Sequence, residues 1–341
     1  MDAQKKFDLL SMGEILLRLS PLPNEKLARG ELLEKRIGGA ELNVAAGVAM
    51  LGLRTGFISK IPDNKIGDFA NNTLHYYGIS GDYLLRDTNK DARLGIYYYE
   101  GAAAPGKPAV VYDRRHSSAL SLTSDELPGE IYRSTRAFHT TGITLALGGA
   151  IRETAVDAIR RFKEAGALVS FDVNFRANLW SEEEARESVN RILPYVDVFF
   201  CSETTARLTF GKKGGLRDIM KSFTEDYPIS VVASTERIVH SPKCHTFGSV
   251  IYDAKQDAFY EEEPYRNIEI VDRIGSGDAY IAGVLYGLLG HNGDCRKALA
   301  YGNAYSAMKN TVPGDLPFCT RKEIDRIIAR HHDGDGAEMD R

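Results

Sequence analysis

Residues 268–289 read IEIVDRIGSGDAYIAGVLYGLL. A β-rich apolar run meets a glycine turn, which leads into a long apolar stretch typical of a buried helix. Gly275 and Gly277 can adopt backbone conformations that other residues avoid, so successive N–H groups can point at one spot. The dipole of the following helix favours negative charge at the same spot. The segment therefore predicts a strand, a turn and a helix, with an anion site at the turn.

Asp278 lies at the mouth of this predicted helix, close enough to a bound phosphoryl group to take a proton from an attacking hydroxyl. Alternatively, Asp278 caps the helix and the glycines only form a tight turn. The segment alone leaves both interpretations open, because short glycine motifs often match by chance. The sequence has no G-x-x-x-x-G-K-[ST] loop, and GSGDAY lacks the last glycine of the dinucleotide fingerprint. Neither a P-loop enzyme nor a Rossmann dehydrogenase is therefore supported.

Short apolar runs rich in β-branched and aromatic residues alternate along the chain with segments that have apolar residues at helical spacing. The strand candidates are FDLLSMG, TGFISKI, AFHTTGI, LVSFDVN, VDVFFCS and ISVVAST, and the helix candidates are ELNVAAGVAMLG, residues 149–165 and SEEEARESVNRILPYV. Parallel strands need such helical crossovers. The pattern predicts an α/β fold with a doubly wound, mostly parallel sheet flanked by helices.

Two stretches interrupt this alternation, residues 14–37 and residues 93–120. Both contain alternating or tyrosine-rich strand patterns and no helical period, which predicts a small antiparallel sheet. Such a sheet is not stable alone in water, so it has to lie on the core or on a partner subunit. We therefore expect a β lid that also serves as a contact between the subunits of a homodimer or higher homo-oligomer.

The composition fits one globular domain over residues 1–330, and the polar residues 331–341 are expected to form a disordered tail. With 43% hydrophobic residues, 26% charged residues and a net charge of -4, the chain has no basic field that would favour nucleic acid. There is no C-x-x-C pair, apolar signal core or apolar run long enough to span a bilayer. We expect a cytoplasmic protein without a membrane or nucleic-acid partner.

Two distant segments resemble the signatures of one enzyme family. VDRIGSGDA resembles the C-terminal signature of the ribokinase-like (PfkB) carbohydrate kinases, commonly D-T-x-G-A-G-D, and RIGGAELNVAAGVAMLG resembles their N-terminal signature. The similarity continues through KIPDNKIGD, VVYDRRHSSA, FDVNFRANLW and SVVAST, and covers Ser11 to Ile328. It implies a ribokinase-like fold and phosphoryl transfer from ATP, with Mg²⁺, to a sugar. The set is most similar to the branch that converts 2-keto-3-deoxygluconate to 2-keto-3-deoxy-6-phosphogluconate.

The resemblance also implies roles for individual residues. Asp278 would be the general base, and the N–H groups of Gly275, Ser276 and Gly277 would hold the phosphoryl charge. It places Gly38, Gly39, Asn43, Tyr97, Tyr112, Arg114, Arg176, Asp278 and Asp315 at the sugar, and Asn174, Arg176, Ser202, Ser234, Gly275, Gly277 and Asn303 at the nucleotide. Arg114 and Arg176 are the candidates for binding the acid group of the sugar, because an arginine fork suits a carboxylate.

Each of these residues also has a structural interpretation. The Gly38–Gly39 pair can be a turn before a helix, the tyrosines can pack across strands, and Arg176 can be a surface residue. For Tyr98 and Tyr99, packing is the interpretation we favour.

The sequence departs from the family pattern in two places. Residues 202–205 read SETT where many relatives carry N-x-x-E, a motif that helps to organise magnesium, so the metal ligands are not assigned. Residues 234–237 read STER where many relatives place a lysine and glycines near the ATP phosphates. A kinase for fructose, ribose or tagatose phosphate, or a catalytically silent sugar or nucleotide sensor, is therefore an open alternative.

Overall fold

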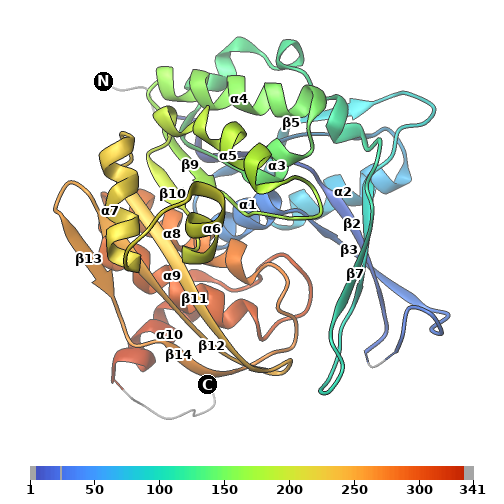
Figure 1. Ribbon diagram of the computed structural model, residues 1–341. Helices are drawn as coiled ribbons and strands as arrows, with labels where there is room; N and C mark the ends of the chain where they lie inside the picture. Colours follow the sequence, from blue (N-terminus) through green and yellow to red (C-terminus); the bar gives the residue numbers. More distant parts are fainter. Residues whose placement is uncertain (1–4, 24, 334–341) are drawn as a thin grey trace.

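The computed structural model describes residues 5–23 and 25–333, and its centre is a large mixed sheet (Figure 1). Its strands are β1 (Phe7–Met12), β4 (Thr55–Pro62), β5 (Ile79–Asp87), β8 (Thr135–Thr141), β9 (Leu168–Asp172), β10 (Val198–Phe200), β11 (Val231–Ser241), β12 (Cys244–Asp253), β13 (Ala258–Glu261) and β14 (Tyr265–Glu269). They follow the order β13-β12-β11-β10-β9-β8-β1-β4-β5, with β14 paired to β12. All six strands predicted from apolar runs are present.

The strands from β11 to β5 are parallel, as the helical crossovers predict. Leu9 of β1 pairs with Thr55 of β4 on one side and with Ala137 of β8 on the other. Because these strands are parallel, their carboxyl ends meet at one edge of the sheet, where open α/β sheets bind ligands. The strands β12, β13 and β14 were not predicted, and they extend the sheet antiparallel beyond β11.

Helices cover both faces of the sheet. They are α1 (Ala40–Met50), α2 (Lys65–Tyr76), α3 (Gly142–Ala146), α4 (Gly149–Glu164), α5 (Glu182–Asn190), α6 (Glu203–Phe210), α7 (Leu216–Asp226), α8 (Ser276–Gly290), α9 (Cys295–Lys309) and α10 (Arg321–Asp333). Val232 of β11 packs in the core with Phe223 of α7, whereas the next residue, Ala233, packs in the core with α8 and α9. The doubly wound arrangement predicted from the sequence is therefore confirmed.

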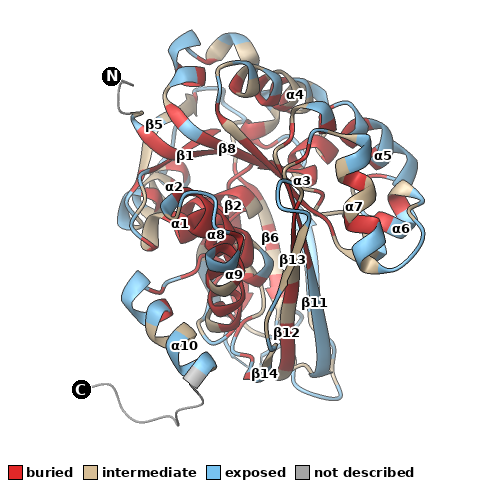
Figure 2. Ribbon diagram, turned by 90° about the vertical axis from the view of Figure 1, so that its left-hand side faces the viewer, coloured by how far each residue is buried: buried red, intermediate tan, exposed pale blue. Residues whose placement is uncertain are grey.

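Helices α8 and α9 are the most deeply buried pair, and Figure 2 shows both largely in red. Their close packing depends on glycine. A Cβ atom at Gly283 would strike the backbone of Tyr301, and one at Gly287 would strike the backbone of Ala298. Because α8 is apolar all round, neighbouring elements fix it from every side and hold its N-terminus in place.

The two predicted inserts form a second, smaller sheet. Its strands are β2 (Leu16–Pro21), β3 (Leu33–Gly38), β6 (Gly95–Glu100) and β7 (Ala109–Asp113), in the order β3-β2-β6-β7. Each insert is an antiparallel hairpin, but the hairpins meet through β2 and β6, which are parallel. This β lid, as we call the four strands, projects beside the core (Figure 1). Arg18 pairs with Tyr97 across β2 and β6, so both side chains lie on one face of the lid.

The C-terminal helix is longer than the sequence suggested. Helix α10 runs to Asp333, so residues 331–333, assigned above to a disordered tail, are helical. The ring of His331 stacks on Tyr265 with centroids 3.9 Å apart, and its Nε2 contacts the Glu263 carbonyl at 2.7 Å. The rest of the predicted tail, residues 334–341, lies outside the described residues. Within the described residues, no helix is long and apolar enough to cross a membrane.

Candidate active site

The turn before α8 has the geometry expected of an anion site. Gly275 is in the left-handed region with φ 82°, and a Cβ there would strike the backbone carbonyl of Asp315, so only glycine fits. At Gly277, an added Cβ would meet no atom within 4 Å. In the described part of the chain, the Gly275 and Gly277 N–H groups have no hydrogen-bond partner. The Ser276 N–H, predicted to join them, donates to the Arg273 carbonyl at 3.3 Å.

Asp278 does not cap α8. The N-cap is Gly275, without a side-chain cap, and Asp278 is the third residue of the helix. Its carboxylate instead accepts a 2.6 Å hydrogen bond from Nδ2 of Asn43 on α1. Burial raises the pKa of Asp278 to about 7, although the Asn43 hydrogen bond opposes the shift. The capping interpretation is therefore wrong, and the group has the pKa of a general base near neutral pH.

Two further carboxylates influence Asp278, and neither was singled out from the sequence. Asp172, the last residue of β9, has a pKa raised to about 7 by burial, and its charge raises the pKa of Asp278. Glu41 is 1% exposed and accepts hydrogen bonds from Thr141 and Thr144, both at 2.7 Å. Burial raises its pKa too. Both positions lie inside motifs that resemble the family, FDVNFR and GGAELN, so those motifs were the available signal.

Asn174 and Arg176 follow β9 at the predicted edge of the sheet. Asn174 has a left-handed backbone with φ 40°, and its N–H donates to Asp172 at 3.0 Å. Arg176 is exposed and donates to the Phe175 carbonyl at 3.0 Å. Its positive charge lowers the pKa of both Asp172 and Asp278. Arg176 is therefore near the carboxylates and retains donors for an anionic ligand.

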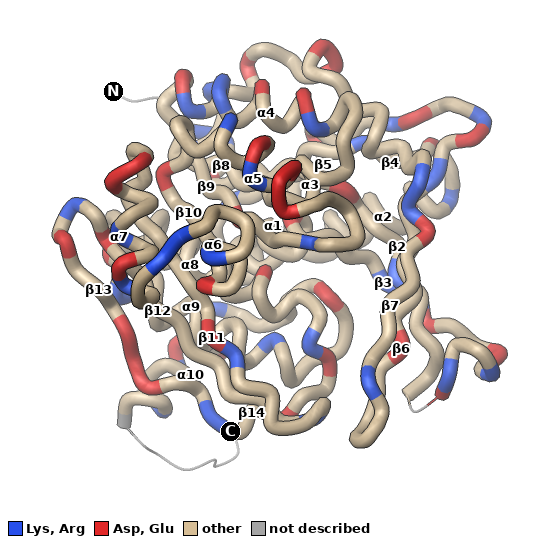
Figure 3. The backbone as a smooth tube through the Cα atoms, in the orientation of Figure 1, with Lys and Arg blue, Asp and Glu red and all other residues tan. Residues whose placement is uncertain are grey.

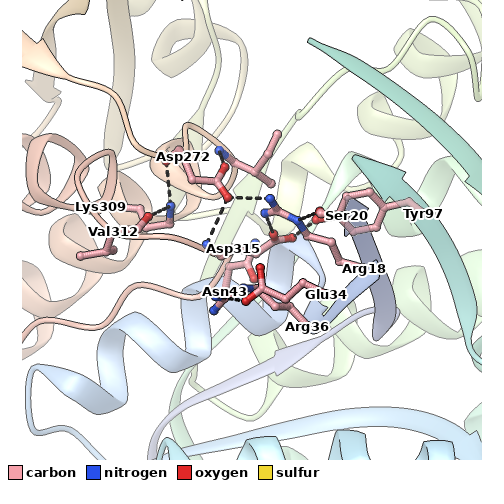
Figure 4. Close-up of polar contacts among 12 residues, drawn as sticks. Arg18, Ser20, Glu34, Arg36, Asn43, Tyr97, Asp272, Lys309, Val312 and Asp315 are labelled. Carbon is pink, nitrogen blue, oxygen red and sulfur yellow. Dashed lines mark hydrogen bonds and ion pairs between the residues drawn. The ribbon is translucent and has the colours of Figure 1, made fainter. Parts of the chain in front are cut away.

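The inner face of the lid meets the core at a buried ionic network (Figure 4). Arg18 contacts Asp272 at 2.6 Å and Asp315 at 2.7 Å, and all three residues are buried. The Tyr97 hydroxyl donates to Asp315, whose carboxylate also fills the space where Gly38 would carry a Cβ. We call Arg18, Asp272, Asp315 and Tyr97 the lid network. Tyr97, Asp315 and Gly38 were predicted at the site, whereas Arg18 and Asp272 were missed.

Lys309, at the end of α9, ties together the two loops that flank the network. Its side chain is fully buried, and its ammonium donates to the carbonyls of Asp272 at 3.0 Å and Val312 at 3.4 Å (Figure 4). Burial lowers its pKa. One loop leads into the Gly275 turn and the other carries Asp315. Lys309 was also missed, because a lysine on a late helix gives no signal of burial in the sequence.

Arg114, predicted to bind the sugar acid, already has a partner. Its Nε donates to buried Glu14 at 2.9 Å, and Ser117 donates to the same carboxylate. Its guanidinium lies 5.5 Å from the ring of Tyr112, which is 42% exposed and 5.9 Å from the ring of Tyr97. The lid thus brings Tyr97, Tyr112 and Arg114 together, as predicted.

Tyr98 is half-buried and Tyr99 is buried, and the guanidinium of Arg18 lies 4.5 Å from the Tyr99 ring. The packing interpretation is therefore confirmed for Tyr99.

The residues predicted at the nucleotide lie on separate elements. Ser202 caps α6 by accepting a bond from the Thr205 N–H at 3.2 Å, and Ser234 is buried on β11. Asn303 is fully buried, donates to Glu262 at 2.8 Å and accepts from Ser249 at 2.7 Å. Across the described ranges, no hydrogen bond or ion pair connects Ser202, Ser234 or Asn303 with Asp278. Their nucleotide roles stay predictions.

At the N-terminal signature, Gly38, Gly39 and Asn43 connect the lid with α1. Gly39 is the N-cap residue of α1 with φ 146°, where a Cβ would strike the Glu14 carbonyl. The following helix then places Asn43 against Asp278. The Gly-Gly turn is thus both structural and part of the site, so its two interpretations do not exclude each other.

A partly buried base at a helix N-terminus with open backbone N–H groups, under a β lid on a doubly wound sheet, defines a sugar kinase of the ribokinase-like class. The model of the pfkB family carbohydrate kinases matches residues 6–320, and the chain belongs to this family. It is a phosphotransferase with an alcohol group as acceptor.

Three similar proteins illustrate the range within the family. The chain is 34% identical over 321 residues to 2-dehydro-3-deoxygalactonokinase from Haloferax volcanii, covering 94% of this chain and 96% of that one. It is 28% identical over 321 residues to 5-dehydro-2-deoxygluconokinase from Clostridium perfringens, covering 93% and 91%. The crystal structure of 2-dehydro-3-deoxygluconokinase from Thermotoga maritima superposes with a TM-score of 0.89 at 33% identity, covering 95% and 99%. Their names share a keto-deoxy sugar acid but differ in its identity.

Proposed function

We propose that this protein transfers the γ-phosphoryl group of ATP to the primary hydroxyl of 2-keto-3-deoxygluconate, forming 2-keto-3-deoxy-6-phosphogluconate. The observation that carries the proposal is the pairing of Asp278, whose pKa is about 7, with the open Gly277 N–H one residue earlier. In this arrangement Asp278 accepts the proton of the attacking hydroxyl, and the N-terminus of α8 stabilises the phosphoryl charge. Asn43 holds the carboxylate in position for that transfer.

Magnesium would enter this site with the nucleotide. Among the residues that the structure describes, no group of three or more Asp, Glu, His or Cys side chains could hold a metal ion by itself. Mg²⁺ commonly keeps several waters and binds through substrate phosphates with one or two carboxylates, so the site does not need a protein cage. The bound ion would neutralise phosphate charge. Asp172, close to Asp278, is the carboxylate best placed to accept hydrogen bonds from its waters.

The sugar-acid assignment rests on the positive charge near the carboxylates. Arg176 is exposed and close to Asp278, so it can donate to a substrate carboxylate with a charge-assisted bond. Arg114 is less available because Glu14 occupies part of its fork. Since similar proteins carry names of isomeric keto-deoxy sugar acids, an isomer of 2-keto-3-deoxygluconate is the second candidate substrate.

ATP turnover with a panel of sugars tests the proposal. The panel contains 2-keto-3-deoxygluconate, 2-keto-3-deoxygalactonate, 5-dehydro-2-deoxygluconate, fructose and ribose. We expect the highest kcat/KM with 2-keto-3-deoxygluconate, and we expect Asp278→Asn to lower kcat by about 10²- to 10⁴-fold. Asp125→Asn, at an exposed position, is the matched control and should leave kcat unchanged. Preference for a neutral sugar would refute the substrate, and an unchanged kcat in Asp278→Asn would refute the base.

We also propose that the lid contacts a second copy of this chain. Strands β3 and β7 are the edges of the lid, and an unpaired edge can pair with the same edge of another molecule. Apolar side chains are exposed there, including Leu33 at 43% and Val111 at 55%. Sedimentation should give a dimer for the wild-type protein and a monomer for Val111→Asp. A monomeric wild type at every concentration would refute the contact.

A further inference from the structure

Glu41 is a buried carboxylate to which the reaction described above gives no role. It is the second residue of α1, it is 1% exposed, and within the part of the chain that the structure describes it forms no ion pair. Moving an ionised carboxylate out of water without a cation is costly unless hydrogen bonds replace its hydration. The contacts that offset this cost show what Glu41 holds together.

Two buried threonine hydroxyls supply the hydrogen bonds. Oε1 of Glu41 accepts from Oγ1 of Thr141 and from Oγ1 of Thr144, both at 2.7 Å. Thr141 ends β8 and caps α3 by accepting from the Ile143 N–H at 3.1 Å, and Thr144 lies within α3. Figure 3 shows α1 and α3 side by side. Glu41 thus ties the first turn of α1 to the end of β8 and to α3.

The carboxyl group of Glu41 also packs against the end of β1. A Cβ atom at Gly13, the residue after β1, would strike this carboxyl group, so glycine leaves the room that Glu41 needs. Strands β1 and β8 are neighbours in the sheet, so Glu41 contacts the carboxyl ends of both. The N-cap residue of α1, Gly39, provides no side-chain cap. The first turn of α1 therefore depends on Glu41 for its attachment to the sheet.

The next polar side chain of α1 is Asn43, which holds the base. Nδ2 of Asn43 donates to Asp278 at 2.6 Å, and among the described residues no other hydrogen bond reaches the Asp278 carboxylate. Asn43 is two positions after Glu41 in the same turn, so a shift of that turn moves the Asn43 amide. The direction of the Asp278 carboxylate therefore depends on where Glu41 attaches α1.

Glu41 also acts on the base through its charge. Burial raises the pKa of Asp278 most, and the negative charges of Asp172 and Glu41 raise it further. The hydrogen bond from α1 and the charge of Arg176 oppose that shift. Burial likewise raises the pKa of Glu41, while the two threonine hydroxyls and the charge of Arg114 oppose the increase. A side chain with the same acceptor but no charge would separate the positional effect from the electrostatic one.

We propose that Glu41 is a positioning residue for phosphoryl transfer: it anchors the first turn of α1 to β8 and α3, so that Asn43 directs the Asp278 carboxylate at the attacking hydroxyl. Glu41 itself does not touch the reacting atoms. The role in transfer rests on the proposed kinase function, whereas the anchoring can be measured without turnover.

Steady-state kinetics of Glu41→Gln and Glu41→Leu with ATP and 2-keto-3-deoxygluconate test the role. Glu41→Gln keeps an acceptor oxygen for the threonines, so its plateau kcat should stay close to that of the wild type. Its acid limb should move to lower pH, because a negative charge near Asp278 is gone. Glu41→Leu removes the acceptor, and it should lower kcat by about a hundredfold, the effect of a misplaced catalytic group, with the KM for ATP unchanged.

Thr144→Val guards the test against misfolding, because it removes one donor and leaves Glu41 in place. It should lower kcat by about tenfold, the loss of part of a charge-assisted hydrogen bond. Thr154→Val is the matched control, because Thr154 is buried on α4 and its hydroxyl donates to the Leu122 carbonyl at 3.0 Å. It should keep the wild-type kcat. Equal kcat in Thr144→Val and Thr154→Val, or equal losses in Glu41→Gln and Glu41→Leu, would overturn the proposal.

Crystal structures of the two Glu41 variants without substrate separate this proposal from the kinase function. We expect the hydrogen bond from Asn43 to Asp278 to be present in Glu41→Gln and absent in Glu41→Leu. A wild type without turnover would refute the kinase function and the role in transfer, while these structures would still decide the anchoring. An unchanged hydrogen bond in Glu41→Leu would overturn the anchoring whatever the activity.

Discussion

Arg18 and Arg273 line the same cavity, but their surroundings are opposite. Arg18 is 5% exposed and lies between two buried carboxylates, whereas Arg273 has a buried Nε and no carboxylate partner among the described residues. A buried cation whose partners are all present stabilises one arrangement of the chain. A cation without partners retains its binding capacity for a ligand. The comparison therefore separates a structural arginine from one available for function.

The same contrast divides two aspartates within residues 268–289. Asp272 contacts Arg18 at 2.6 Å and accepts from the Gly314 N–H at 3.1 Å. Asp278 receives a hydrogen bond from Asn43 but has no ion pair in the described structure, and its pKa is about 7. The two residues lie on either side of one glycine turn. Because Asp272 has both an ion-pair partner and a hydrogen-bond donor, it fixes the turn. Asp278 remains able to exchange a proton at neutral pH.

Arg18→Met is expected to have the largest effect on stability. It leaves Asp272 and Asp315 buried without their cation, and breaking a buried ion pair in this way costs about 3–5 kcal/mol. Urea unfolding measures the loss. Arg36→Met is the control, because its pair with Glu34 is half-exposed and should contribute at most about 1 kcal/mol. Equal losses of unfolding free energy in the two variants would show that the lid network stabilises the fold no more than an exposed ion pair does.

Lys309→Met should have the next largest effect. Its ammonium satisfies two buried carbonyls, so its removal should cost about 1.5–3 kcal/mol, the contribution of a hydrogen bond to a charged group. Because those carbonyls belong to the loops that carry the Gly275 turn and Asp315, kcat should fall as well. Urea unfolding and steady-state kinetics measure the two effects. Lys322→Met is the control, because Lys322 is exposed on α10. A Lys309→Met variant with wild-type stability and kcat would show that Lys309 does not hold the two loops together.

The core of the fold could be predicted because its signals are local. Six strands and the helices α1, α4 and α5 follow from apolar periodicity, and the start of α8 follows from its glycines. The strands β12, β13 and β14 were missed because β12 mixes glycine and polar residues with its apolar ones, and β13 and β14 have only four and five residues. The parallel pairing of β2 with β6 was missed for another reason, since it joins two hairpins that are distant in sequence and leaves no local pattern.

The site was predictable where a residue belongs to a motif and not where its role depends on a distant partner. Asp278 and Asn43 were found through two motifs, and they are hydrogen-bonded across 235 positions of sequence. Arg18 looks like an ordinary polar residue of an alternating strand, and only the fold brings it to Asp315, 297 positions away. Lys309 and Arg273 were missed likewise. The sequence does not show that these side chains are buried away from any carboxylate partner, because that depends on how the fold packs.

The pH dependence should follow the two carboxylates that lack cations. Asp278 must be ionised to act as a base, so kcat/KM should fall about tenfold per pH unit below about 7. Asp172→Asn removes a negative charge that raises the pKa of Asp278, so the acid limb should move to lower pH. Stability changes in the opposite sense. Between 3.8 and about 7 native Asp278 retains a proton that the unfolded chain loses, so the free energy of unfolding falls as pH rises.

A pH–rate profile of the wild type and Asp172→Asn, with urea unfolding at pH 5 and pH 8, measures both effects. Asp125→Asn should reproduce the wild-type profile, because its side chain is exposed. An acid limb that remains in the same place in Asp172→Asn would mean that Asp172 does not affect the base. Since the two groups interact, the measured values belong to the pair and not to either residue alone.

Arg273→Met should have the smallest effect on stability, and its sign should be opposite to that of Arg18→Met. No ion pair is lost within the described structure, one buried unsatisfied donor disappears, and repulsion with Arg237 is relieved. We expect a change within about 0.5 kcal/mol, towards higher stability in urea unfolding. A loss of several kcal/mol in Arg273→Met would instead show that Arg273, like Arg18, serves the fold.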